Sequence, residues 1–260
     1  MARIKLILVM VLVGGTAVLM QLTRGETAVA QPHAATVILY DAALNTGTPD
    51  TQEMVYLTQP SPPFPPSQAS QTFSNTVTIL DTTATNEDYA GYFGPEDFAD
   101  LDRSLGYQVN FTVKLDSESH ANSNRAGFSL IVLSNDIQGI ELGFWQDEVW
   151  AQHDDTTGTL FTHGEGAALA TAVGLIAYEL TVISDTYTLA ANNVPVLTGP
   201  LRDYSSFTGI IDPYEIPNLL FLGDDTTSAQ ARIQLSYVAV TVNEPPLEPT
   251  NFLYLPLIMK

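Results

Sequence analysis

Residues 124–165 read NRAGFSLIVLSNDIQGIELGFWQDEVWAQHDDTTGTLFTHGE. This stretch holds both tryptophans of the chain and two of its four histidines. Its apolar residues alternate with polar ones or form short runs between turn-forming residues, which is typical of successive antiparallel strands. We therefore predict that the stretch forms the centre of a β-sheet.

A hairpin lies in the middle of this stretch. Residues 140–145 form one predicted strand and residues 149–154 form the next. A two-residue turn at Asp147 and Glu148 sets the register, because the turn fixes which residues face each other. The predicted cross-strand pairs are Trp145 with Trp150, Gly143 with Gln152, and Glu141 with Asp154.

The same register divides the hairpin into two faces, because side chains alternate along a strand. The predicted inward face carries Leu142, Phe144, Ala151 and His153. The predicted outward face carries Glu141, Trp145, Trp150, Gln152 and Asp154, and a turn at residues 156–157 adds Phe161 and His163 to it. We call this outward set the tryptophan face.

The N-terminus has the pattern of a secretory signal peptide. Arg3 and Lys5 precede an apolar run over residues 6–20, and residues 28–30 form an A-x-A cleavage site. We predict that residues 1–30 are a signal peptide that is removed, so the protein is exported and is extracellular or at the cell surface. An uncleaved N-terminal anchor is the alternative.

The remaining chain is predicted to form one domain and a tail. Residues 35–243 form the β-sandwich domain, and residues 244–260 form a proline-containing linker with a short apolar end. A bilayer span needs about 20 apolar residues, which is more than this end supplies. We predict no transmembrane span after signal removal.

Composition narrows the classes of partner. The formal net charge is −20, with 9 basic and 29 acidic residues, and there is no cysteine. Phosphate binding needs Lys and Arg, so we predict no nucleic-acid partner. Soluble neutral polymers and cations are compatible with this charge. The lack of cysteine excludes disulfides, thiol chemistry and Cys-ligated metals, so stability must come from the hydrophobic core.

Short strands separated by turn signals run through the whole domain. The predicted strands are 35–40, 55–57, 72–81, 107–115, 127–133, 178–183, 186–190, 194–197, 218–222 and 231–242, with one short helix at 95–101. Many short strands at such regular spacing predict an all-β fold, an antiparallel two-sheet β-sandwich of jelly-roll type.

Several sequence blocks occur in a fixed order that resembles a bacterial domain family called choice-of-anchor Y. They are LDRSLGYQVNF, SHANSNRAGFSLIVLSNDIQGIELGFWQDEVWAQ, FTHGE, LRDYSSF, DPYEIPN and FLGDDTTSA, within residues 37–242. The resemblance implies an exported surface protein with a C-terminal anchor, and it implies no activity. This chain departs from members that carry a Val-Pro-Glu-Pro sorting tail, because it ends in NFLYLPLIMK. The strand pattern is also similar to the concanavalin-A-like jelly roll.

Three functions remain open. Carbohydrate binding is the first, because aromatic rings stack on sugars while carboxylates and amides bind hydroxyls. Its candidate residues are Trp145, Trp150, Gln152, Glu141, His163, Phe161 and Arg125, and its partner would be a glycan or cell-envelope polysaccharide. A hydrolase or lyase that uses Glu141 and Asp154 is the second, since glycoside hydrolysis needs two carboxyl groups. A structural surface or adhesion protein without a ligand site is the third.

No cofactor is predicted, although calcium is possible because it prefers clustered oxygen ligands. The candidate calcium ligands are Asp154, Asp155, Asp224 and Asp225. Basic residues are scarce, so Arg125 and Arg202 are each expected to pair with a nearby acid, which for Arg202 would be Asp203.

Overall fold

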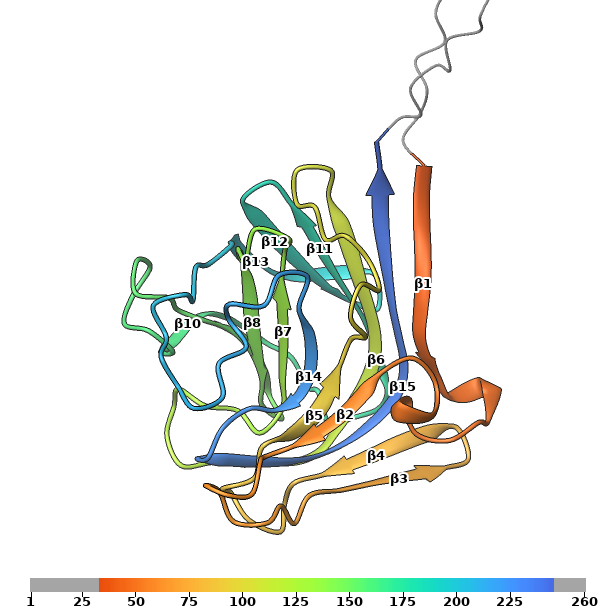
Figure 1. Cartoon of the computed structure of the whole chain (residues 1–260), viewed down its shortest axis with the longest axis vertical. Helices are drawn as coiled ribbons and strands as arrows, with labels where there is room; N and C mark the ends of the chain where they lie inside the picture. Colours follow the sequence, from red (N-terminus) through yellow and green to blue (C-terminus); the bar gives the residue numbers. More distant parts are fainter. Residues whose placement is uncertain (1–32, 246–260) are drawn as a thin grey trace, which may run out of the picture. The chain divides into compact units, whose positions relative to one another are not determined.

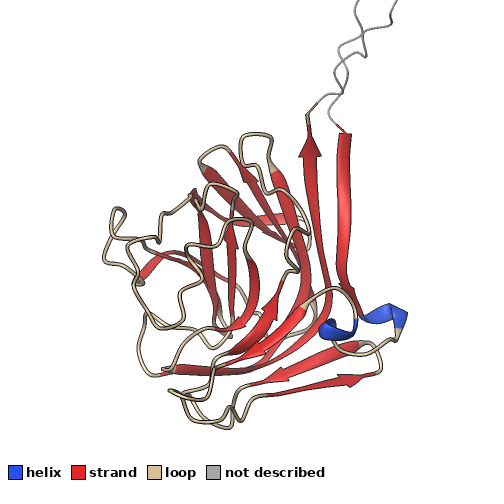
Figure 2. Cartoon of the chain, viewed as in Figure 1, coloured by secondary structure: helices blue, strands red, loops and turns tan. Residues whose placement is uncertain are grey.

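The computed structural model describes residues 33–245. The predicted signal peptide and the chain from residue 246 onward lie outside these residues. Within the described part, fifteen strands form two antiparallel sheets, joined by loops and two short 3-10 helices (Figures 1 and 2). The predicted antiparallel two-sheet β-sandwich of jelly-roll type is confirmed.

An eight-stranded sheet forms one layer. Its order is β13-β12-β11-β6-β15-β4-β3, and β1 pairs with the end of β15. The bounds are β1 His33–Asp41, β3 Ser70–Ser74, β4 Val77–Asp81, β6 Tyr107–His120, β11 Ile176–Ile183, β12 Thr186–Ala191, β13 Val194–Pro200 and β15 Ala229–Glu244.

A seven-stranded sheet forms the other layer, in the order β10-β9-β8-β7-β14-β5-β2. The bounds are β2 Val55–Thr58, β5 Ala90–Phe93, β7 Ser129–Leu133, β8 Gly139–Phe144, β9 Glu148–Gln152, β10 His163–Ala168 and β14 Leu220–Asp224. Four of these neighbouring strands, β7 to β10, come from or begin in residues 124–165. No helix among residues 33–245 is long and apolar enough to cross a bilayer.

Two local predictions were wrong, both because a residue takes a left-handed backbone conformation. The predicted strand 72–81 is two strands, β3 and β4, with Asn75 at φ 59° in the turn between them. The predicted helix 95–101 is an irregular loop, because Asp97 has φ 60°. Asn and Asp adopt this conformation more readily than other non-glycine residues.

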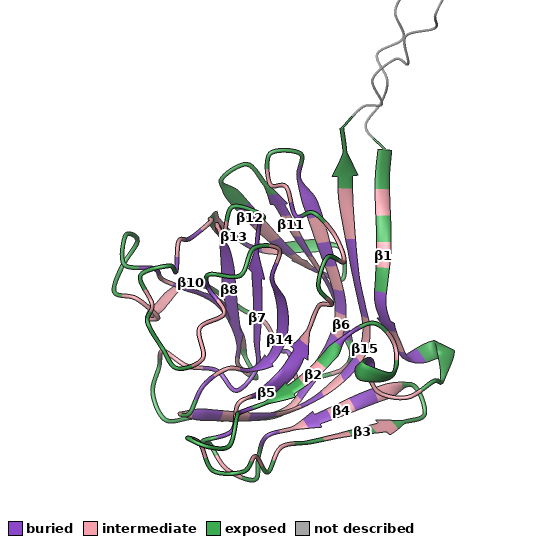
Figure 3. Ribbon diagram, viewed as in Figure 1, coloured by how far each residue is buried: buried purple, intermediate pink, exposed green. Residues whose placement is uncertain are grey.

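The main core lies between the two sheets and follows the alternation of their strands. Leu142 and Phe144 of β8 and Ala151 of β9 belong to it, as predicted, together with Phe111 of β6. The rings of Phe111 and Phe144 meet edge to face with centroids 6.0 Å apart. Every residue of β7, β8 and β14 is buried, so loops cover the outer face of these strands as well (Figure 3).

The hairpin of β8 and β9 pairs two residues away from the predicted register. Gly143 faces Trp150, and the N–H of Trp145 donates to the carbonyl of Glu148 at 2.8 Å, so the turn consists of residues 146–147. The predicted pairing of Trp145 with Trp150 is therefore wrong, and so are the other two pairs. A shift of two residues keeps side chains on their predicted faces, because the faces alternate with period two.

Packing explains this register, because Trp150 needs a residue without a side chain opposite it. A Cβ atom on Gly143 would stand 2.8 Å from two carbons of the Trp150 indole. Real carbon atoms do not approach so closely without displacement of one group. Glycine at position 143 therefore leaves the space that the indole fills.

We predict that Gly143→Ala lowers the free energy of unfolding by about 1–3 kcal/mol, the usual cost of overpacking a filled site. Urea titration of the purified protein measures this value. Gly174→Ala is the matched control, because a Cβ at position 174 meets no atom within 4 Å. Equal stability of the two variants would contradict the packing explanation.

Candidate functional site

Two rows of side chains cross the outer face of the seven-stranded sheet. The first row is bulky and consists of Glu141, Ile131, Phe221 and Phe93, which are paired in turn on β8, β7, β14 and β5. The second row is small and consists of Gly143, Ser129, Gly223 and Gly91 on the same strands. The small row makes room for neighbouring rings: the Trp150 indole lies over Gly143 and the Phe221 ring lies over Gly91.

A cleft of about 890 Å³ lies over this part of the face. Small-molecule sites commonly measure about 300–1,000 Å³, so the cleft is at the upper end of that range. Six aromatic side chains line it: Tyr89, Phe93, Phe161, Phe207, Tyr214 and Phe221. Its polar lining includes Asn122, Asn124, Arg125, Glu141, Gln152 and Asp225.

A carboxyl pair, Glu141 and Asp225, lies in the polar lining. Glu141 is 2% exposed, Asp225 lies close enough to shift its pKa, and the hydroxyl of Tyr214 donates to Glu141 Oε2 at 2.5 Å. Ser129, from the small row, acts on Asp225 in the opposite direction to burial and lowers the pKa of its carboxyl group. Burial and then the negative charge of Asp225 raise the pKa of Glu141 well above its usual range. Burial and the neighbouring carboxylate therefore both favour the protonated form of Glu141.

Two further polar groups face the pair. Arg125 Nη1 donates to the carbonyl of Phe161 at 2.6 Å, and its positive charge partly offsets the burial that raises both carboxyl pKa values. Arg125 forms no direct ion pair within residues 33–245, contrary to prediction. Gln152 Nε2 donates to the carbonyl of Asn124 at 3.3 Å, whereas Gln152 Oε1 is buried and has no partner among the described residues.

A tyrosine hydroxyl is inserted between β8 and β9 at this point. Tyr204 Oη accepts from the N–H of Glu141 at 3.2 Å and donates to the carbonyl of Gln152 at 2.8 Å. It lies on the connection between β13 and β14, residues 201–219, which runs over the outer face of the sheet (Figure 1). The hydroxyl replaces a direct ladder bond and holds the two strands apart beside the cleft.

The tryptophans lie on the predicted outer face but do not form an open surface. Trp150 is 0% exposed, its Nε1 has no partner among the described residues, and the ring of His163 stacks on it with centroids 4.3 Å apart. Trp145 is half-buried under His120, at the same centroid distance. The prediction that both indoles face solvent is wrong, because the histidines and loops cover them.

The covered tryptophans support the loop that carries Arg125. Trp145 Nε1 donates to the carbonyl of Arg125 at 2.9 Å, and the N–H of His163 donates to Asn124 Oδ1 at 3.0 Å. Together with the bond from Gln152, these contacts attach residues 124–125 to β9 and β10. The predicted residues Arg125, Glu141, Gln152 and Phe161 thus meet in the cleft, while Trp145, Trp150 and His163 stand behind it.

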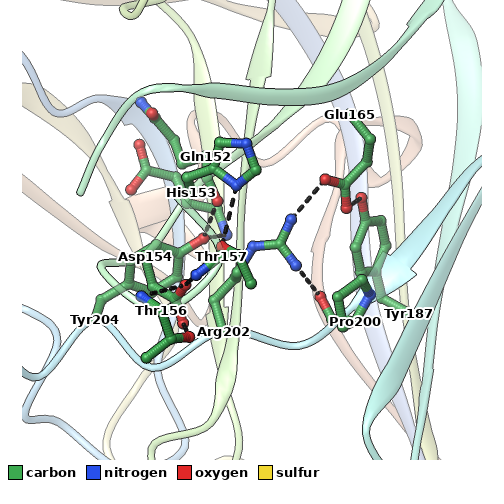
Figure 4. A network of polar contacts seen from close by, with 11 residues as sticks. Gln152, His153, Asp154, Thr156, Thr157, Glu165, Tyr187, Pro200, Arg202 and Tyr204 are labelled. Carbon is green, nitrogen blue, oxygen red and sulfur yellow. Dashed lines mark hydrogen bonds and ion pairs between the residues drawn. The ribbon is translucent and has the colours of Figure 1, made fainter. Parts of the chain in front are cut away.

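Asp154 is not the partner of Glu141. Its carboxylate accepts from the N–H groups of Thr156, Thr157 and Asp203 and from two threonine hydroxyls (Figure 4). Burial would raise the pKa of Asp154, but these bonds outweigh it and lower the pKa to about 2. Asp154 therefore organises a turn. His153 is half-buried in the same turn, with Nδ1 3.0 Å from the Thr157 hydroxyl, and is not an inward-facing strand residue as predicted.

Arg202 pairs with Glu165 rather than with Asp203. Its Nη2 donates to Glu165 Oε2 at 2.5 Å and its Nη1 donates to the carbonyl of Pro200 at 2.7 Å (Figure 4). Tyr187 donates to the other oxygen of Glu165 at 2.8 Å. Through this pair, the buried Arg202 ties β10 to the end of β13 and anchors the start of the connection that carries Tyr204.

The candidate calcium ligands do not gather at one place. Asp224 accepts from the Thr82 hydroxyl at 2.7 Å, Asp225 lines the cleft with Glu141, and Asp155 is exposed. Asp154 is occupied by the turn described above. Within residues 33–245, no group of three or more His, Cys, Asp or Glu side chains is arranged to hold a metal ion.

Sequence reasoning missed Ser129, Tyr204 and Tyr214, and it considered Asp225 only as a metal ligand. Strand alternation could place Ser129 on the outer face, but it could not show what lies over it. The two tyrosines stand in a long loop of polar and turn-forming residues. Their burial in the structure, and no feature of the loop's sequence, shows that the loop folds back over the sheet.

Comparisons with known proteins bear on the fold. Neither a protein-family model nor a curated protein matches the sequence. A carbohydrate esterase from the Shiga toxin-encoding bacteriophage phi24B has a similar structure, with TM-score 0.54, 12% identity, and coverage of 81% of this chain and 100% of that one. An endo-1,3-β-glucanase from Streptomyces sioyaensis has TM-score 0.47, 12% identity, and coverage of 86% and 100%. A protein of unknown function with a galectin-like fold, from Bacillus subtilis, has TM-score 0.43, 11% identity, and coverage of 82% and 96%. At these identities, the likeness shows the fold alone.

The raised pKa of Glu141 predicts a stability that falls as pH rises. An unfolded glutamate loses its proton near pH 4.3, whereas folded Glu141 keeps it, so the native state binds more protons above that pH. We expect Glu141 to lower the free energy of unfolding by up to about 1.4 kcal/mol for each unit of increase in pH. This decrease ends once the pH exceeds the raised pKa of Glu141. Glu141→Gln, which resembles the protonated acid, should remove that part of the slope.

Urea titrations at several pH values between about 5 and 8 measure the slope. Glu53→Gln, at an exposed position, is the control and should keep the wild-type slope. The loss of stability at low pH should be the same in both variants as in wild type. That loss comes in part from protonation of Asp154, whose pKa is about 2. An unchanged slope in Glu141→Gln would contradict a protonated Glu141.

Proposed function

We propose that the cleft on the outer face of the seven-stranded sheet binds carbohydrate without catalysing a reaction. One observation carries the proposal. Gln152 Oε1, an acceptor without a partner among the described residues, lies in the cleft wall with the Glu141–Asp225 pair and Arg125. Such a group of acceptors and donors is suited to the hydroxyls of a sugar.

The charge of the site supports a neutral ligand. Burial and the charge of Asp225 favour the neutral form of Glu141, and Arg125 is near enough for its charge to lower the pKa of both carboxyl groups. A uronate would place another carboxylate beside Asp225, which is unfavourable. The rings of Phe161 and Tyr214, 5.2 Å apart between centroids, give the same site flat apolar faces for stacking.

The arrangement of carboxyls favours binding over hydrolysis. Glycosidases hold two carboxyl groups about 5–9.5 Å apart, so that the scissile bond or a water fits between them. Glu141 and Asp225 lie close enough for each to shift the pKa of the other, and the Tyr214 hydroxyl occupies one oxygen of Glu141. Glu141 and Asp154, the pair predicted from the sequence, have separate partners.

The sequence supports a place outside the cytoplasm for this activity. The signal pattern in residues 1–30 supports export, and the ordered sequence blocks support membership of the choice-of-anchor Y family. The protein is then a cell-surface or secreted module, and its partner is a glycan or a cell-envelope polysaccharide.

A glycan array followed by calorimetric titration tests the proposal. Wild type is expected to bind a neutral oligosaccharide, and Asp225→Asn is expected to bind it about 10–100-fold more weakly, since a hydrogen bond to a charged group contributes roughly 1.5–3 kcal/mol. Asp155→Asn makes the same charge change at an exposed position outside the cleft and should bind like wild type. Absence of binding by all three proteins would favour a scaffold without a ligand site. Release of reducing ends from a polysaccharide would favour the hydrolase.

A further inference from the structure

The cleft has an apolar side that sugar recognition does not explain. A second cluster of buried residues, separate from the core between the sheets, lies on the outer face and contains Ile131, Tyr214 and Phe221. Phe161, Phe207 and Leu160 pack against this cluster and also line the cleft.

Exposed aliphatic side chains continue this apolar side to the rim. Ile210 is 74% exposed and Leu57 is 50% exposed, and both line the cleft together with Ile211. Branched aliphatic side chains have no flat face on which a sugar ring stacks. Exposed apolar side chains that gather around one concavity are typical of a binding surface for apolar groups.

The polar and apolar sides adjoin at Glu141. This residue joins the Asp225 pair on one side and, through the hydroxyl of Tyr214, the apolar cluster on the other. A ligand that fills the cleft therefore contacts hydroxyl-binding groups at one end and Ile, Leu and Phe side chains at the other. The volume of about 890 Å³ is at the upper end for small-molecule sites, so it has room for both parts.

We infer that the ligand is a neutral sugar that carries an alkyl or acyl chain, with the sugar at Glu141, Asp225 and Gln152 and the chain along Phe207 and Ile210. This inference rests on the proposed carbohydrate binding and adds the class of ligand to it. The chain gains free energy by leaving water, and the sugar sets its orientation through the polar end.

A series of alkyl glycosides tests the inference. Methyl, butyl, hexyl and octyl β-D-glucosides and β-D-galactosides, each below its micelle concentration, are titrated into the protein by calorimetry. From butyl to octyl, we expect Kd to fall roughly fourfold for each added methylene, the equivalent of about 0.8 kcal/mol. Ile210→Ser should reduce this increment. Ile216→Ser is the matched control, because Ile216 is exposed on the same connection and lies outside the cleft lining.

The outcomes separate this inference from the proposed function. Binding of the glycosides with the same Kd at every chain length would overturn the inference and leave carbohydrate binding intact. Equal affinity for octanol and for the octyl glycosides would show an apolar site. It would overturn sugar recognition in both the inference and the proposed function. No binding of any glycoside, together with a negative glycan array, would overturn both. A vesicle-pelleting assay with a glycolipid, compared with the soluble octyl glycoside, distinguishes a membrane lipid from a soluble acylated sugar as the source of the chain.

Discussion

Burial of an acidic side chain on the outer face of β8 constrains the rest of the site. A buried carboxylate must be protonated, paired or hydrogen-bonded, because an isolated charge away from water is very costly. Glu141 meets this requirement with three groups that are far apart in sequence: Asp225, Tyr214 and the field of Arg125. The loops before β7, before β14 and after β14 therefore have to converge over one strand.

The connection between β13 and β14 supplies much of this convergence. Arg202 anchors its start through Glu165, Tyr204 inserts its hydroxyl between β8 and β9, and Tyr214 reaches Glu141. Each contact satisfies a polar group that burial would otherwise leave without a partner. The loop is thus held by specific bonds to strands, which gives the cleft a fixed wall.

The tryptophans stand behind the wall of the cleft. Their rings, stacked between His120 and His163, form a covered layer that fixes the carbonyl of Arg125. The tryptophans lie on the same sheet face as the cleft but do not line it. The aromatic lining on this side comes from Phe161, Tyr214 and Phe207. Of the aromatic residues in 124–165 that were predicted to contact a ligand, Phe161 lines the cleft and the two tryptophans do not.

The sequence by itself determined most of the strands, the faces of the central hairpin strands and the two-sheet architecture. These features follow from the period-two alternation of apolar residues, and the alternation survives a two-residue error in register, which is why Leu142 and Phe144 point inward as predicted. Only the tertiary structure decided that Asp225, not Asp154, meets Glu141 and that Trp150 is covered. Contacts between a strand and a loop more than 70 residues away leave no periodic signal, because they depend on how loops fold back over the sheet and on which buried polar group each loop residue can satisfy.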